Sequence, residues 1–234
     1  MQVSHAIRER RSVRAFLPEQ VPAEVVRHLL DLARWAPSWG NSQDWNAYVV
    51  SGTTLDVMKA AFQQLAEENA PSASDLPRPP QEWPPYLAER MNMRRPSAEA
   101  PNALAGMSGD GPGPFDFWGA PTLILFAADS DLEPTYACFD AGLIVQTLCL
   151  AAEDRGFSTC IMAMAVRYAD ILHELIPHAA GQRFVIGVAL GLADHNAVIN
   201  RGDRRRVEIE EWATFVSDLA EEPAAVADAP GDVG

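Results

Sequence analysis

The chain is short of positive charge and almost devoid of lysine. Its 234 residues carry 32 Asp and Glu against 18 Lys and Arg, a formal net charge of -14, and Lys59 is its one lysine. Nucleic acids and other polyanions attract a broad positive field, so this balance argues against a nucleic-acid-binding surface. A small anion in a local pocket remains compatible with it, because arginine guanidinium groups suit two-point binding of carboxylate or phosphate.

Cysteine, long apolar runs and nucleotide-binding loops are also scarce or missing. The three cysteines, Cys138, Cys149 and Cys160, show no metal-ligand spacing. No apolar run reaches the ~20 residues that span a bilayer, and the N-terminus has no apolar signal segment. We therefore expect a reduced, cytoplasmic protein without a membrane segment or a bound metal. No GxGxxG opens a helix after a strand and GxxxxGK[ST] is absent, so a nucleotide-like ligand must be held in another way.

Apolar residues recur at helical spacing in three segments and form short continuous runs in three others. The predicted elements are, in chain order, helix 19–36, strand 46–52, strand 121–128, helix 135–155, helix 166–176 and strand 183–193. Gly156 is expected to end the longest helix with a left-handed cap, and Gly187 and Gly191 indicate close approach to a backbone. Few strands and no regular βαβ alternation favour a three-layer α+β domain over a doubly wound sheet.

Two segments depart from this pattern. Eleven of the 18 prolines lie between residues 71 and 121, so residues 69–118 are expected to form a poorly periodic insertion with one short helix near 86–95. Residues 217–234 are acidic and rich in Ala and Pro, which predicts a disordered tail. The predicted domain therefore covers residues 1–216.

Arginine is concentrated in two clusters near the two ends of this domain. Four arginines fall within residues 8–14 and four more within 201–206. If the first segment is helical, Arg10 and Arg14 share a face. Converging guanidinium groups suit a phosphate, whereas a solvated basic face is the alternative for either cluster alone. Two such clusters in a strongly acidic chain favour a shared anion.

The segment WAPSWGNSQDW, residues 35–45, combines hydroxyl, amide and indole groups. Tryptophan offers flat apolar surface to a ring system, and the short side chains of Ser38, Asn41 and Gln43 can bind ring heteroatoms. The alternative is a surface loop with aromatic anchors packed on the core. The histidines show no nucleophile or metal spacing with the cysteines or acids.

RRSVRAF near the N-terminus, followed by a helix that ends in APSWGNSQDW before a strand, resembles the FMN-dependent nitroreductase family. DAGLIVQTLCLAAEDRGFSTCIM is similar to the family's central helix and the loop after it, and GVALGLAD with NRGDRRRVEIEEW to its last core strand and basic tail segment. The resemblance covers most of residues 4–214 and is strongest to the nitrobenzoate-type branch. It implies a nitroreductase-like fold with a central, mainly antiparallel sheet flanked by helices, in an intertwined homodimer.

The resemblance also implies FMN as the cofactor and assigns residues to it by motif position. The two arginine clusters take its 5′-phosphate, the loop at 35–45 reaches the flavin from the partner subunit, and the segment after the central helix lies along the ring. The residues assigned in this way are Arg10, Arg11, Ser12, Arg14, Arg204 and Arg206 for the phosphate, Pro37, Ser38, Trp39 and Asn41 across the dimer, and Gln146, Cys160, Ile161, Met162 and Ala163 at the ring.

This sequence departs from the family pattern at three places. Asp44 stands where the family usually has proline before the tryptophan. Ile161 to Met164 occupy positions where many members have glycine, and Arg204 lies where related sequences often carry serine.

The chemistry implied by the resemblance belongs to the flavin, with no obligate side-chain acid or base. NADH or NADPH would reduce it and leave, and a nitroaromatic or quinone-type acceptor would then enter the same face, in a ping-pong cycle. The insertion would line the pocket for this aromatic acceptor with Trp83, Tyr86, Phe115 and Phe117. Enone reduction, reductive dehalogenation, flavin fragmentation on the same fold, and a non-catalytic flavin-binding protein remain as alternatives.

Overall fold

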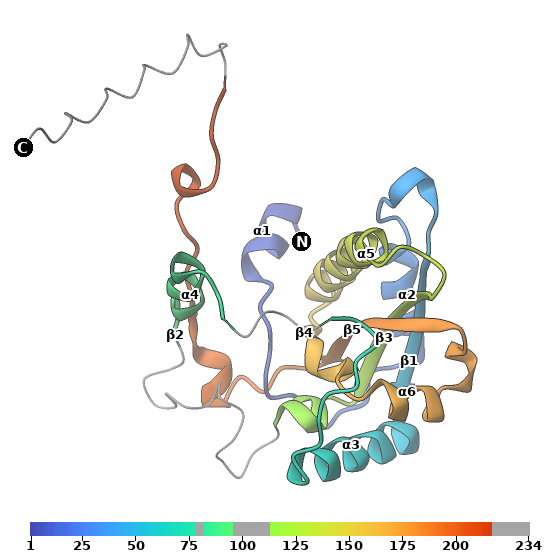
Figure 1. Cartoon of the computed structure of the whole chain (residues 1–234). Helices are drawn as coiled ribbons and strands as arrows, with labels where there is room; N and C mark the ends of the chain where they lie inside the picture. Colours follow the sequence, from blue (N-terminus) through green and yellow to red (C-terminus); the bar gives the residue numbers. More distant parts are fainter. Residues whose placement is uncertain (78–81, 96–112, 217–234) are drawn as a thin grey trace, which may run out of the picture.

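The computed structural model describes residues 1–77, 82–95 and 113–216, and at its centre lies a four-stranded antiparallel sheet (Figure 1). The strand order is β1-β3-β5-β4, so the two longest apolar strands occupy the middle. The strands are β1 (Trp45–Ser51), β3 (Thr122–Asp129), β4 (Ser158–Met162) and β5 (Gln182–Gly191). The register is fixed by pairs such as Val49 opposite Ile124 and Cys160 opposite Ala189.

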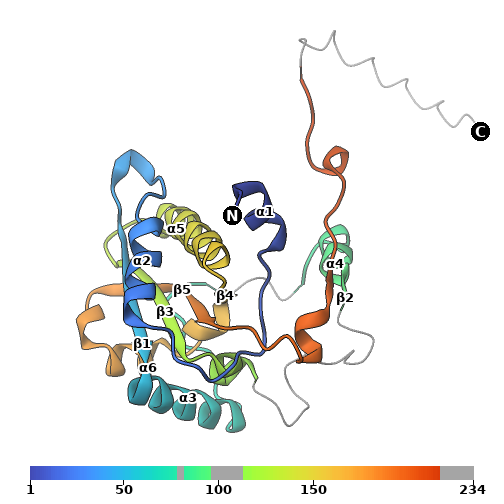
Figure 2. The ribbon, with the colours of Figure 1, turned by 180° about the vertical axis from the view of Figure 1, so that it is seen from behind.

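Helices cover both faces of the sheet and complete three layers (Figures 1 and 2). One face carries α2 (Ala23–Ala33) and α5 (Pro134–Asp154), and the other α3 (Gly52–Glu67) and α6 (Ala169–Leu175). Strand β3 is buried on both faces: Ile124 packs in the core cluster under α2 and α5, and Leu125 in the cluster over α3 and α6. The α+β fold class predicted from the sequence is confirmed.

Two glycines in β5 allow neighbouring elements to approach closely, as the sequence suggested. A Cβ atom on Gly187 would lie 2.5 Å from the Cβ of Ala165, and one on Gly191 would lie 2.8 Å from the Cδ of Pro121. Gly156 follows α5 with φ 76°, the left-handed conformation predicted for its cap. These glycines bring β5 against the turn after β4 and fix the end of the core helix.

The N-terminal arginine segment is not helical from Arg10 onwards, so the condition under which Arg10 and Arg14 would share a helix face is not met. Helix α1 (Val3–Glu9) ends before the first of them. The chain then runs extended beside β4, where Ser12 pairs with Thr159 and the Val13 N–H donates to the Thr159 carbonyl at 3.0 Å. Pairing with an exposed sheet edge satisfies these backbone groups, and it outweighs the local preference for a helix.

The C-terminal segment leaves the body after β5. It contains the turns η6 (Val198–Arg201) and η7 (Ile209–Glu211) and the short strand β6 (Asp203–Arg204). Strand β6 pairs antiparallel with β2 (Arg94–Arg95), which follows α4 (Pro85–Asn92), the short helix expected inside the insertion. Residues 78–81 and 96–112 of the insertion and the tail 217–234 lie outside the described residues. Figures 1 and 2 show the C-terminal segment projecting past α1.

All six predicted helices and strands are present, with ends shifted by a few residues. Helix α3 and strand β4 were not predicted. In α3 the buried Leu55, Met58 and Phe62 do recur at helical spacing, so the signal was present beside the proline-rich region. Strand β4 is five residues long and mixes polar with apolar side chains, so its sequence is too short to show the alternation that predicts a strand.

Among the described residues, α5 is the one helix long and apolar enough to cross a membrane by length and composition. Eight of its residues are buried, and five of these pack in the core cluster with the sheet and α2. Burial of this kind is typical of the core helix of a globular domain.

Candidate functional site

The two arginine clusters lie side by side because Asn200 joins the segments that carry them. Its Oδ1 accepts the Arg14 N–H at 2.7 Å, and its Nδ2 donates to the Ala15 carbonyl at 2.8 Å. The Arg11 Nη1 donates in turn to the Asn200 carbonyl at 2.9 Å. Sequence reasoning missed Asn200, although its place next to the second cluster was a usable signal.

Arginines of both clusters lie within electrostatic reach of one another around Arg204. The Arg204 guanidinium donates to the Arg10 carbonyl. Burial lowers the pKa of Arg204 first, and the charges of Arg11, Arg10 and Arg206 lower it further, against a smaller opposing effect of Glu9. Guanidinium groups that repel one another are stabilised by an anion between them. The convergence predicted from the sequence is thus present in one chain.

Arg14 and Ser12 are placed differently from the other members of this group. The Arg14 Nη1 donates back to the Ser12 carbonyl at 3.2 Å, and both residues are half-buried in the extended segment. Arg206 is exposed, and its Nη1 donates to the Arg205 carbonyl at 3.0 Å. Arg10, Arg11 and Arg206 are the arginines whose charges act on Arg204, and we call these four residues the arginine cluster.

Strand β4 presents alternate residues to the core and to the surface at its C-terminal end. Cys160 and Met162 are buried in the core, so only their backbone groups are available to a ligand. Ile161 and Ala163 are exposed. The side chains that stand where many family members have glycine therefore point alternately outward and inward. Met162 points into the core and takes up no space at the surface, whereas Ile161 and Ala163 are exposed.

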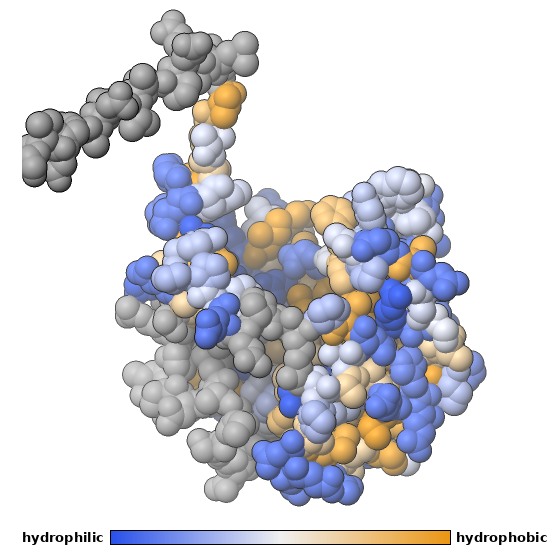
Figure 3. Space-filling view, viewed as in Figure 1, coloured by the Kyte–Doolittle hydropathy of each residue, from blue (hydrophilic) through white to orange (hydrophobic). Residues whose placement is uncertain are grey.

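Arg10 also approaches the middle of α5, where Gln146 is exposed. Burial raises the pKa of the Cys149 thiol, while a hydrogen bond to Thr159 and the charge of Arg10 act in the opposite direction. Cys149 lies one turn after Gln146 on the same helix. Arg10 and Thr159 of β4 therefore both lie near this part of α5. Figure 3 shows a recess between the C-terminal segment and the body of the domain.

The segment 35–45, here called the tryptophan loop, lies on the other side of α5 from the arginine cluster, as both views show (Figures 1 and 2). Its Trp39 is 69% exposed, and its ring lies 5.8 Å from that of Tyr136. Pro37 and Asn41 are exposed too, whereas the Ser38 Oγ accepts the Gln43 N–H at 2.9 Å and so orders the loop itself. One chain does not bring this loop to the arginines.

A buried acid, Asp140, joins the tryptophan loop to α5. Its Oδ2 accepts the Trp39 N–H at 2.9 Å and the Ser42 hydroxyl at 3.5 Å. Asp140 is 1% exposed. Sequence reasoning did not single it out, although a lone acid at the start of the apolar run DAGLIVQ was the signal available.

The four aromatic residues expected around an acceptor do not share one environment. Trp83 and Tyr86 are exposed at the start of α4, and Phe115 is half-buried with its ring 6.4 Å from that of Tyr168. Phe117 is fully buried, its ring 5.2 Å from that of Phe62. Its assignment to the acceptor pocket is wrong, because its side chain is part of the core.

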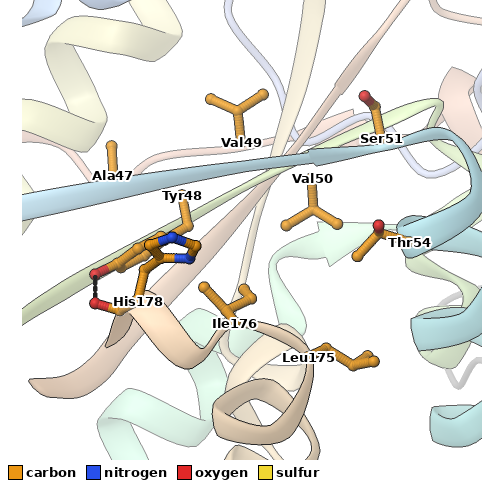
Figure 4. A pocket seen from close by; sticks show the side chains of 9 residues that line it. All are labelled: Ala47, Tyr48, Val49, Val50, Ser51, Thr54, Leu175, Ile176 and His178. Atoms are coloured by element: carbon orange, nitrogen blue, oxygen red, sulfur yellow. Dashed lines mark hydrogen bonds between the residues drawn. The ribbon is translucent and has the colours of Figure 1, made fainter. Parts of the chain in front are cut away.

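A pocket of about 360 Å³ lies on the β1 edge of the sheet (Figure 4). It is lined by Ala47, Tyr48, Val49, Val50, Ser51, Thr54, Leu175, Ile176 and His178. The Tyr48 hydroxyl donates to the His178 carbonyl at 3.0 Å and lies 2.7 Å from the Gln182 Oε1. Strands β1 and β4 are opposite edges of the sheet, so this pocket is separate from the arginine cluster.

A protein-family model described as Nitroreductase family matches residues 7–192. A 4-nitrobenzoate reductase of Pseudomonas putida is 33% identical over 205 residues, which cover 83% of this chain and 86% of that protein. A chloronitrobenzene nitroreductase of Comamonas testosteroni is 30% identical over 236 residues, covering 92% and 97% of the two chains.

Solved structures of nitroreductases share the fold of this chain. The FMN-dependent nitroreductase NfnB from Mycobacterium smegmatis, solved in complex with NADPH, superposes with a TM-score of 0.79 at 28% identity. The match covers 92% of this chain and 97% of that one. A nitroreductase with bound FMN from Bacteroides fragilis shares the fold with a TM-score of 0.63 at 18% identity.

Proposed function

The chain belongs to the nitroreductase family, and we propose that it is an FMN-dependent oxidoreductase which uses NAD(P)H to reduce nitroaromatic compounds. The relatives described above are named for this chemistry. Quinones, which are also flat electron acceptors, belong to the proposed substrate range. We place the enzyme in the cytoplasm, where NADH and NADPH are available.

The observation that carries the proposal is the arginine cluster. Arg10, Arg11, Arg204 and Arg206 come from the two ends of the domain, and their charges meet in a chain whose net charge is -14. A phosphate monoester carries nearly two negative charges and three acceptor oxygens, which suit several guanidinium forks at once. The residues present therefore fit the 5′-phosphate of FMN.

The flavin ring would lie between β4 and α5, beside Gln146 and the exposed Ile161 and Ala163. Bound FMN supplies the hydride chemistry, so the chain's own residues bind, orient and exclude water. The arginine cluster fixes the phosphate, and the exposed β4 side chains offer apolar surface to the ring. In the proposed ping-pong cycle, NAD(P)H and the acceptor use the same open face in turn.

A second copy of the chain would complete the site. The tryptophan loop and the arginine cluster lie on opposite sides of α5 in one chain (Figures 1 and 2). Large aromatic side chains in the tryptophan loop and in the first turns of α5 are exposed: Trp35 at 77%, Tyr136 at 56% and Phe139 at 65%. Exposed aromatic surface of this kind is typical of a protein interface. A homodimer that pairs these surfaces would bring each tryptophan loop to the partner's flavin.

The test is an anaerobic absorbance titration of the purified protein with NADH or NADPH, followed by 4-nitrobenzoate. Flavin absorbance that bleaches with the nicotinamide and returns with the nitro compound supports the proposal. A protein that binds FMN but is not bleached supports the flavin-binding alternative. A protein that neither carries nor takes up FMN overturns both.

A further inference from the structure

The tryptophan loop is held in a conformation that its own residues do not favour. Gly40, Asn41 and Gln43 have φ of 56°, 60° and 50°. The left-handed region suits glycine, but it costs of order 1 kcal/mol or more for a residue with a Cβ atom. Such a conformation persists where surrounding contacts impose it, so the loop needs a fixed anchor outside itself.

Asp140 is that anchor. Its Oδ2 accepts the Trp39 N–H at 2.9 Å and the Ser42 hydroxyl at 3.5 Å, so it binds the loop at two points around the left-handed residues. It projects from α5, which is packed against the sheet, and it is 1% exposed. A buried acceptor on a rigid helix gives these contacts a fixed position.

The other oxygen of Asp140 has no hydrogen-bond partner, and the same is true of one oxygen of Asp44. Both atoms, the Oδ1 of Asp140 and the Oδ1 of Asp44, are buried. Within residues 1–77, 82–95 and 113–216, neither carboxylate has a basic group within ion-pair distance. A buried carboxylate oxygen without a donor is costly, so the hydrogen bonds from the loop to the other oxygen of Asp140 are needed to offset its burial.

The charges of these two acids act on each other. Burial raises the pKa of Asp44, and the charge of Asp140 raises it further, while the Asp44 backbone N–H lowers it. Asp140 is the one charged side chain among the described residues that contributes to this shift. The charge of Asp140 therefore reaches the end of the tryptophan loop, where Asp44 lies.

We propose that Asp140 is the positioning residue of the tryptophan loop, because its buried Oδ2 accepts from both the Trp39 N–H and the Ser42 hydroxyl and so fixes the left-handed turn between them. This inference rests on the proposed function only where it concerns FMN, because the loop contacts lie within one chain.

The direction of the pH dependence follows from the raised pKa of Asp44. A carboxyl whose folded-state pKa is raised favours folding when it is protonated. The stabilisation is complete below the ordinary Asp pKa of 3.8 and is lost as the pH rises through the higher folded value. The loop is therefore expected to be firmly held in acid and looser at neutral pH.

The first experiment follows Trp39 directly in the full-length protein without FMN. The six tryptophans are replaced by 5-fluorotryptophan, and Trp39→Phe identifies the Trp39 fluorine resonance. We expect this resonance to titrate with pH in the wild type and to resemble a solvent-exposed indole at every pH in Asp140→Ala. Asp140→Asn should keep the wild-type position, because its amide oxygen can accept the Trp39 N–H and the Ser42 hydroxyl. Asp44→Asn should abolish the titration, because it removes the carboxyl whose pKa is raised.

A Trp39 resonance that is unchanged in Asp140→Ala overturns the positioning role. An Asp140→Asn variant that behaves like Asp140→Ala overturns the proposed hydrogen bonds, since the amide oxygen can accept both of them. The matched control is Asp31→Asn, which removes an exposed carboxylate paired with Arg34. It should retain the wild-type titration.

The second measurement is FMN affinity, which links the loop to the cofactor. Loss of a hydrogen bond to a charged acceptor predicts an FMN Kd about ten-fold higher in Asp140→Ala. Asp140→Asn should stay within about two-fold of the wild type, since the contact is kept. If Trp39 moves but FMN affinity does not, the positioning role stands and the loop's contact with the flavin is overturned. If the wild type binds no FMN, the proposed function fails, and the Trp39 titration still decides this inference.

Discussion

The arginine cluster and the tryptophan loop are both short surface segments with strong sequence signals, but they are held in different ways. Asn200, a neutral amide, joins the arginine segments within one chain. Asp140, a buried acid, holds the tryptophan loop, and the loop itself carries Asp44, whose pKa is raised by burial and by the charge of Asp140. An amide does not titrate and a carboxyl does. The contacts that join the arginine segments should therefore be indifferent to pH, and the tryptophan loop should respond to it.

The largest expected effect comes from the arginine cluster. Arg10→Ala removes a charged hydrogen-bond donor and should raise the FMN Kd by up to about 100-fold. Riboflavin, which has no phosphate, should bind the variant as it binds the wild type. Paired titrations with the two ligands measure the difference, and the exposed Arg27→Ala serves as the matched control. Equal weakening of both ligands would place Arg10 away from the phosphate.

The amide that aligns the cluster comes next. Asn200→Ala leaves the Arg14 N–H and the Ala15 carbonyl without their partner, which should lower the free energy of unfolding by about 2 kcal/mol. The FMN Kd should rise about ten-fold as the cluster loosens. Urea denaturation and FMN titration report the two effects separately. The exposed Asn196→Ala should change neither, and unchanged FMN affinity in Asn200→Ala would mean that the cluster does not need this amide.

A substitution in the tryptophan loop should weaken the binding of FMN and of riboflavin equally. Trp39→Ala removes an exposed indole, and the loss of one aromatic contact predicts about five-fold weaker binding of FMN and of riboflavin. Preferential loss of FMN would contradict a role at the ring.

Mixed dimers test whether the two regions meet across subunits. If each site takes arginines from one chain and the loop from the other, a dimer of Arg10→Ala with Trp39→Ala has one site with both defects and one with neither. Half of its sites should then bind FMN with wild-type affinity. Sites built within one chain would leave every site defective, and no tight binding would return.

The smallest expected effect is on stability as a function of pH. Asp44→Asn removes the carboxyl whose pKa is raised by burial and by Asp140. The variant should gain stability relative to the wild type near pH 7, where the wild-type carboxyl is ionised at a cost, and the gain should vanish below the ordinary Asp pKa of 3.8. Tm values measured over this range provide the test. An equal difference at every pH would show that Asp44 does not titrate against its neighbour.

Much of the fold could be predicted because continuous apolar runs and helical periodicity can be recognised within one segment of the sequence, without knowledge of its partners. Strand β3, buried on both faces, is one example, and the glycines of β5 are another. The extended course of residues 10–16 could not be predicted, because its backbone pairs with Thr159, far away in the sequence. Local spacing carries no information about such a partner.

The candidate site, like the fold, was predictable from the sequence only in part. Arginines in two clusters pointed to a shared anion from charge alone, and the structure brings them together. Asn200 and Asp140 were missed, since their importance depends on which backbone groups they reach after folding. Phe117 illustrates the opposite error, because an aromatic residue in a poorly periodic segment was assigned to the acceptor pocket while its ring fills the core.

The contact between Arg14 and Asn200 joins residues that are 186 positions apart. During synthesis the N-terminal arginines leave the ribosome first, and their counterparts follow only when nearly the whole domain has been made. A nascent chain therefore has half of an anion site for most of its translation. If the arginine cluster holds the FMN phosphate as proposed, cofactor loading waits for the completed polypeptide, and the supply of FMN then influences how much finished protein becomes active but not how the chain begins to fold.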